Sequence, residues 1–124
     1  MIKKRLDSVK NATYGLWWVL KTQTNLQISV FLSILSIIGG WYLKISYEEF
    51  LIILVLIFIG LGIETVNTAI EETIDALHKE RTEEIRIAKD VSAAAMFIFS
   101  IGAFIIASII FLPRIFNFQF SIFN

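Results

Sequence analysis

The side chains best suited to chemistry lie in one short stretch that continues directly out of a strongly apolar run. Three acids and an amide recur there at helical spacing: Glu64, Asn67, Glu71 and Asp75. At roughly 100° per residue, a helix places all four on one face. Because a bilayer strongly disfavours a lone carboxylate, an acidic stripe that starts inside one indicates a functional site. The alternative is that only Glu64 lies at membrane depth and that the others belong to a solvated helix end.

The composition favours a membrane protein of one domain, residues 1–124. Hydrophobic residues make up 56% of the 124 residues, and the mean hydropathy is +0.74. That is too apolar for a soluble domain of this size. The formal net charge of zero argues against nucleic acid as a partner. Because the chain contains no cysteine, it has no disulfide framework, thiolate metal site or thiolate nucleophile.

Two charge-free runs are long enough to cross a bilayer, which needs about 20 mostly apolar residues. One lies between Lys21 and Lys44, and the other lies between Asp90 and Arg114, with a stop expected at Pro113. Upstream of both, apolar residues recur every three or four positions, which predicts an amphipathic helix on the membrane surface. We therefore expect an all-α membrane protein with a surface helix at 2–24 and spanning helices at 26–44, 49–77 and 84–113.

The second span determines the depth of the acidic stripe. Its uncharged part, Phe50–Ile63, has only 14 residues, which is too short to span a bilayer alone. It spans only if the helix continues through Glu64 to about Ile70, and no proline interrupts that continuation. Glu64 is therefore expected inside the membrane boundary, with Glu71 further toward the water.

The basic residues predict the orientation. Cytoplasmic loops carry an excess of Lys and Arg. Here the N-terminal segment and the loop after the second span carry most of them: Lys3, Lys4, Arg5, Lys10, Lys21, Lys79, Arg81, Arg86 and Lys89. We therefore expect a multi-pass protein of the inner (cytoplasmic) membrane whose acidic stripe opens toward the cytoplasm, where nucleotides and Mg²⁺ are available.

The residues that remain favour metal-assisted phosphoryl transfer over other chemistry. The chain has no glycine-rich phosphate loop, no Ser/His/Asp set and no paired-histidine zinc motif. Mg²⁺ prefers one or two carboxylates together with water and substrate phosphates. Glu64 and Glu71 are about two turns, roughly 10 Å, apart along a helix. One carboxylate can then meet a hydroxyl at lipid headgroup depth while the other reaches a polyphosphate whose charge Lys89 neutralises. This arrangement suits phosphoryl transfer to a lipid alcohol.

Two segments carry a resemblance to a known family. Residues 64–75 read ETVNTAIEETID, which resembles the signature E-x-x-N-S/T-A-I-E-x-x-x-D of the small prokaryotic diacylglycerol kinases, a family that includes undecaprenol kinases. Residues 88–95, AKDVSAAA, are similar to its second signature, A-K-D followed by small residues. The spacing of the two signatures also fits, and the resemblance extends over nearly the whole chain.

The resemblance implies a homotrimeric, integral-membrane lipid kinase with sites between subunits. The enzyme would transfer phosphate from ATP to a membrane lipid alcohol, with Mg²⁺ as cofactor. Diacylglycerol is the first candidate for this alcohol and undecaprenol is the alternative. The implied catalytic residues are Glu64, which accepts the proton of the lipid hydroxyl, and Asn67, which supports the site. Glu71 would bind Mg²⁺ and contact ATP. The other implied nucleotide-binding residues are Glu80, Lys89 and Asp90.

The sequence departs from the family pattern at two positions. Many members have a second metal carboxylate before the first span, where this chain has the neutral Gln23, and a Gln carbonyl is a weaker Mg²⁺ ligand than a carboxylate. The nucleotide segment keeps Glu80 but has Thr82 in place of a common histidine.

Two readings without catalysis remain open at the level of the sequence. A small ion-channel subunit would use Glu64 for ion passage, but it would not require the Lys89–Asp90 pair. A metal-binding bundle would use Glu64, Glu71 and His78, which recur at heptad spacing.

Overall fold

The computed structural model describes residues 1–117, and residues 118–124 of the predicted domain lie outside this part. The described chain is helical, with α1 (Ile2–Thr22), α2 (Thr24–Tyr42), α3 (Tyr47–Leu77) and α4 (Glu83–Ile115). Within residues 1–117 there is no β-strand. The last three helices are long and apolar enough to cross a membrane. The predicted all-α membrane fold, a first helix followed by three candidate spans, is confirmed.

Local polar signals determine where the helices begin. Ser46 caps α3 in a reciprocal capping box with Glu49, and the Thr82 hydroxyl accepts a bond from the Ile85 amide at the start of α4. Gln23 has an extended backbone and separates α1 from α2. The side chain of Gln27 then donates to the Leu20 carbonyl at 2.9 Å, which satisfies an otherwise open acceptor at the end of α1.

The end of α4 differs from the expectation. The helix passes through Pro113, where a stop was predicted, and ends at Ile115. A proline in the last turn removes one backbone hydrogen bond and leaves the preceding helix intact. The side chain of Arg114 also donates to the Ile110 carbonyl at 2.8 Å, which supports this last turn.

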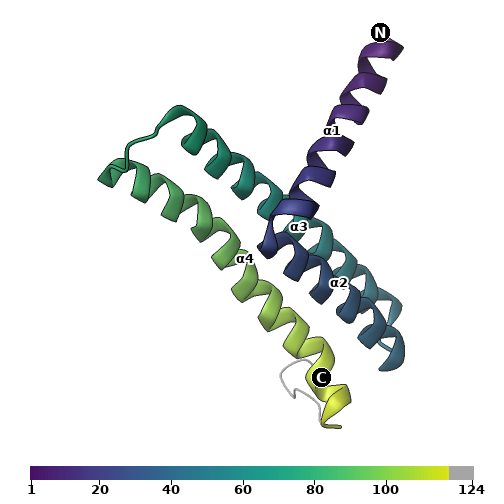
Figure 1. Ribbon diagram of the computed structural model, residues 1–124. Helices are drawn as coiled ribbons and strands as arrows, with labels where there is room; N and C mark the ends of the chain where they lie inside the picture. Colours follow the sequence, from purple (N-terminus) through teal and green to yellow (C-terminus); the bar gives the residue numbers. More distant parts are fainter. Residues whose placement is uncertain (118–124) are drawn as a thin grey trace.

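The helices are arranged around an antiparallel hairpin of α3 and α4. Figure 1 shows α2 beside the part of α3 that is remote from the hairpin loop, while α1 projects away from the start of α2. Gly60 permits close contact between α3 and α4, because a Cβ there would lie 2.6 Å from the Phe99 ring. At about 1.5 Å per residue, α3 is about 46 Å long and α2 about 28 Å, so the loop end of the hairpin extends beyond α2.

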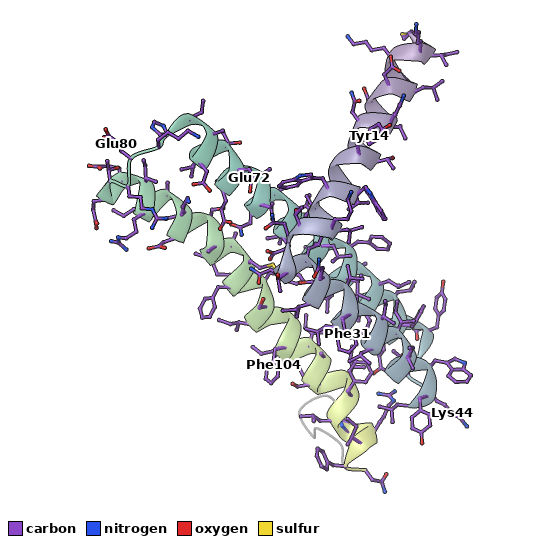
Figure 2. All side chains as sticks on the ribbon, in the orientation of Figure 1. Tyr14, Phe31, Lys44, Glu72, Glu80 and Phe104 are labelled. Carbon is purple, nitrogen blue, oxygen red and sulfur yellow. The ribbon has the colours of Figure 1, made fainter. Side chains whose placement is uncertain are left out.

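Most apolar side chains of the spanning helices lie on the outside of the single chain. Phe31 on α2 and Phe104 on α4 are 60% and 73% exposed, and both lie on the outer surface in Figure 2. Within residues 1–117, the buried large apolar residues are few: Val19, Leu26, Ile53 and Ile110. Such a surface is suited to contact with lipid or with further protein, because exposure of so much contiguous apolar surface to water is unfavourable.

α3, with 31 residues, is long enough to cross a bilayer and to continue beyond it. A hydrocarbon core of about 30 Å spans about 20 helical residues. Counted from Tyr47, where α3 begins, the opposite boundary falls close to Asn67. If one boundary lies at Tyr47, this count would put Glu64 just inside the other boundary and Glu71 just outside it.

Candidate functional site

Three polar side chains on α3 are buried in the single chain. Glu64 is 4% exposed, Asn67 is 8% exposed, and Thr68 on the next turn is also buried. Thr68 donates its hydroxyl to the Glu64 backbone carbonyl at 3.1 Å, so it is satisfied within its own helix. The carboxylate and the amide are thus the buried groups that remain for chemistry. Both were predicted as catalytic residues.

The carboxylate of Glu64 faces polar groups from two directions. The side-chain amide of Asn25, at the start of α2, approaches it within hydrogen-bonding range. Glu71, two turns further along α3 and half-buried, is close enough for the two negative charges to repel each other. The start of α2 therefore lies level with Glu64, and α3 continues beyond it toward the loop without cover from α2.

Asn67 is linked to the neighbouring helix. Ser92 of α4 donates its hydroxyl to the Asn67 side-chain oxygen at 2.6 Å. The sequence analysis missed Ser92 as a site residue. Its signal is positional, because Ser92 follows the Lys89–Asp90 pair by less than one turn and the hairpin brings this turn of α4 opposite Asn67.

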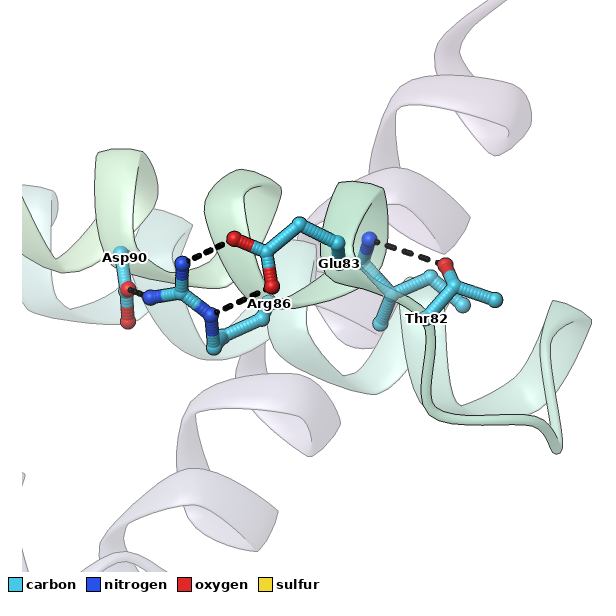
Figure 3. Close-up of polar contacts among 5 residues, drawn as sticks. Thr82, Glu83, Arg86 and Asp90 are labelled. Carbon is cyan, nitrogen blue, oxygen red and sulfur yellow. Dashed lines mark hydrogen bonds and ion pairs between the residues drawn. The ribbon is translucent and has the colours of Figure 1, made fainter.

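Closer to the loop, ion pairs hold the predicted nucleotide residues. Lys89 bonds to Asp75 of α3. Asp90 bonds to Arg86 at 2.9 Å, and Arg86 also pairs with Glu83 (Figure 3). Except for Lys89, which is half-buried, these groups are largely exposed. Such pairs are weak in water and are readily exchanged for a more strongly charged partner. Lys89 and Asp90 thus both have counter-charges within the single chain.

A cavity of about 650 Å³ lies at the hairpin loop. Its wall combines apolar residues such as Ile74 and Ile85 with polar residues of the loop, among them His78, Lys79, Glu80 and Thr82. This volume is in the range of small-molecule sites. Glu80, labelled at the loop in Figure 2, is thereby placed at a cavity next to the turn that carries Lys89.

The two predicted metal positions are not joined in the single chain. The side chain of Gln23 donates to the Thr22 hydroxyl at 3.3 Å, at the break between α1 and α2. Within residues 1–117, no three acidic, histidine or cysteine side chains gather closely enough to hold a metal ion. This finding contradicts, for the single chain, the metal-binding bundle of Glu64, Glu71 and His78.

These observations define a class of protein. It is a small helical membrane protein in which a buried carboxylate lies next to a set of exposed charges. Residues 10–111 match the prokaryotic diacylglycerol kinase family, and the chain belongs to that family. It is 32% identical over 114 residues to the undecaprenol kinase of Bacillus subtilis (strain 168), an alignment that covers 92% of this chain and 93% of that relative. The protein is therefore a lipid kinase. This assignment excludes the hypothesis that the protein is an ion-channel subunit without catalysis.

Proposed function

We propose that the protein transfers the γ-phosphoryl group of ATP to the hydroxyl of a membrane polyprenol, with diacylglycerol as the second candidate. The observation that carries the proposal is the burial of Glu64 on a helix long enough to cross a membrane, beside Asn67 and within reach of Asn25. The sequence alone put diacylglycerol first. The relative that aligns over nearly its whole length is an undecaprenol kinase, and for this reason we place the polyprenol first.

In this proposal Glu64 is the general base. The lipid hydroxyl oxygen forms a bond to the γ-phosphorus, the bond from that phosphorus to the leaving oxygen of ADP breaks, and the hydroxyl proton passes to Glu64. The proposal puts Glu64 close to the membrane boundary, where a lipid hydroxyl reaches this carboxylate from the bilayer. Asn67 supports the reacting groups from the next turn of α3. Most of the catalysis then comes from positioning and charge stabilisation.

The nucleotide would bind on the loop side of Glu64. Lys89 exchanges Asp75 for a phosphate oxygen, and Asp90 and Glu80 line the nucleotide region. Mg²⁺ is usually held by one or two carboxylates, water and substrate phosphates, and Glu71 supplies one half-buried carboxylate of that kind. The donor set fits an ion that arrives with ATP, and this ion would neutralise charge on the phosphates. Gln23 is a weak further ligand.

We also propose that the working unit is a homotrimer with its sites open to the cytoplasm. Intramembrane acids normally face the interior of a bundle. In the single chain the segment from Glu71 to Asp75 is flanked by α4 and lies beyond the end of α2, so another subunit has room to complete the site. The cytoplasmic placement rests on the distribution of Lys and Arg along the sequence.

A side-by-side assay of the two lipids tests the proposal. Purified protein in mixed micelles is given ATP, Mg²⁺ and either undecaprenol or diacylglycerol, and phosphorylated lipid is measured. We expect kcat/KM for undecaprenol to exceed that for diacylglycerol by about tenfold or more, a typical consequence of differences in pocket fit. The opposite preference would make the protein a diacylglycerol kinase. Transfer to neither lipid would refute the proposed reaction.

A further inference from the structure

One serine of α4 directs its hydroxyl away from its own helix. Serines in membrane-spanning helices commonly donate to the carbonyl four residues earlier. Four serines of the described candidate spans do so: Ser33, Ser36, Ser100 and Ser108. Ser92 instead donates to the side-chain oxygen of Asn67 on α3 at 2.6 Å. The hydroxyl is therefore used for a contact between helices, at the level of the buried carboxylate.

The direction of this bond determines how the Asn67 amide is turned. Its oxygen accepts from Ser92, so its NH₂ group points away from α4. Within residues 1–117, no buried side-chain nitrogen or oxygen lacks a partner, and no hydrogen bond from the Asn67 nitrogen is formed. The nitrogen therefore keeps access to the molecular surface. Two N–H donors are available there to a ligand.

The opposite orientation of the amide would be unfavourable for catalysis. Turned by half a rotation, Asn67 would present its oxygen to the site, where Glu64 and Glu71 already concentrate negative charge. An oxygen lone pair repels phosphoryl oxygens, whereas N–H groups stabilise the charge on them. The negative charge of Glu64 and Glu71 favours the N–H groups on the side of the site, and the Ser92 hydroxyl supplies a donor for the amide oxygen on the other side. An alanine at position 92 would leave the amide oxygen without this partner, so the amide would no longer be held in place.

We propose that Ser92 is a positioning residue that holds the Asn67 amide with its N–H groups toward the γ-phosphoryl group during transfer. This inference rests on the proposed function. In the step, the lipid oxygen bonds to phosphorus, the bond to ADP breaks, and the proton goes to Glu64. Asn67 donates a hydrogen bond to a phosphoryl oxygen, and Ser92 exchanges no proton.

Kinetics of three variants test the proposal in the full chain. Ser92→Ala should lower kcat about tenfold and leave the KM for ATP within about twofold, because orientation is lost and ground-state nucleotide contacts are kept. Ser92→Thr keeps a hydroxyl and should recover most of the rate. Ser108→Ala, on the same helix and bonded only to its own backbone, is the matched control and should equal wild type.

A double-mutant cycle separates positioning from simple packing. If Ser92 acts through Asn67, Ser92→Ala in an Asn67→Ala background should cause no further loss of kcat. A full additional tenfold loss, with wild type active, would overturn the proposal and leave the lipid kinase function intact. An unchanged kcat in the single variant Ser92→Ala would do the same.

A spectroscopic readout keeps the test independent of turnover. In ¹⁵N spectra of the protein in micelles, the side-chain NH₂ signals of Asn67 are assigned by their loss in Asn67→Asp. We expect two well-dispersed signals in wild type that move toward the average positions of free amides in Ser92→Ala. Unchanged signals would contradict the positioning role even if no lipid were phosphorylated, so failure of this inference and failure of the proposed function are distinguishable.

Discussion

At the scale of residues, the role of Glu64 can be separated from that of an ordinary buried acid. Its isosteric variant Glu64→Gln keeps the size and the hydrogen-bonding shape of the side chain but cannot accept a proton. A general base typically contributes about 10²–10⁴-fold, so we expect kcat to fall at least a hundredfold while nucleotide binding persists.

The control for this prediction is Glu72→Gln, an exposed acid on the same helix that faces away from the stripe. It should retain wild-type kcat. Kinetics with undecaprenol and a separate measurement of ATP binding check both variants. A loss below about tenfold for Glu64→Gln would remove Glu64 from the role of base.

Gln23 allows a test in which function is gained. Replacing Gln23 with Glu restores the carboxylate that many members of the family carry, and a second hard anionic oxygen strengthens Mg²⁺ binding. We expect Gln23→Glu to lower the Mg²⁺ concentration for half-maximal activity several-fold. Thr24→Glu, which adds the same charge one residue later, should have a smaller effect. An unchanged Mg²⁺ dependence would mean that the metal site forms without position 23.

At the scale of elements, the α3–α4 hairpin is fastened at its end remote from the loop. Arg114 of α4 makes a two-pronged bond to Glu49 of α3, with distances of 2.6 and 2.8 Å, and both side chains are half-buried. Two-pronged Arg–carboxylate bonds are strong and geometrically specific. This pair fixes the register of α3 against α4 about 22 Å from Glu64, at 1.5 Å per residue.

We expect Glu49→Gln to lower the stability of the protein by roughly 1–2 kcal/mol, because Arg114 then lacks a charged partner in a partly desolvated place. Thermal unfolding in detergent, followed by circular dichroism, measures the change. Glu48→Gln, an exposed neighbour in the same first turn, is the control and should leave the melting temperature unchanged. Equal melting temperatures for both variants would show that the pair does not stabilise the hairpin.

The sequence predicted the elements well and the contacts between them poorly. Charge-free runs and the length needed to cross a bilayer were enough to predict three candidate spans, and the acidic stripe was enough to predict the residues that are buried on α3, Glu64 and Asn67. Pairings such as Asn67 with Ser92 depend on the register of α3 against α4. The helical periodicity of the sequence does not determine this register. One signal was available: in an antiparallel hairpin, paired residues lie at equal distances from the loop. The midpoints of the Asp75–Lys89, Asn67–Ser92 and Glu49–Arg114 pairs all fall near residues 79–82.

At the scale of the whole molecule, the orientation in the membrane is open to chemical labelling. The native chain contains no cysteine, so single cysteines can be introduced without background. The exposed positions Glu48 and Lys79 lie at opposite ends of the hairpin. From the placement of Lys and Arg we expect Glu48→Cys to react with an impermeant maleimide in intact cells and Lys79→Cys to react only after permeabilisation. The reverse pattern would place the nucleotide site outside the cell and contradict the proposed use of ATP.

A single chain leaves its own site half enclosed. The acidic segment of α3 beyond α2 is flanked by α4, and α1 contacts α3 only slightly, so we expect a neighbouring subunit to complete each site. Glu64 of one subunit and Lys89 of its neighbour would then act on the same pair of substrates. In that case, two variants that are each inactive can restore activity when they assemble together. When Glu64→Gln and Lys89→Ala are unfolded together, mixed in equal amounts and refolded into lipid, half of the subunits supply an intact Glu64 and half of their neighbours supply an intact Lys89. Random assembly then restores about a quarter of wild-type activity. Each variant refolded alone is the control and should stay inactive. If the mixture is as inactive as its components, Glu64 and Lys89 act from the same chain.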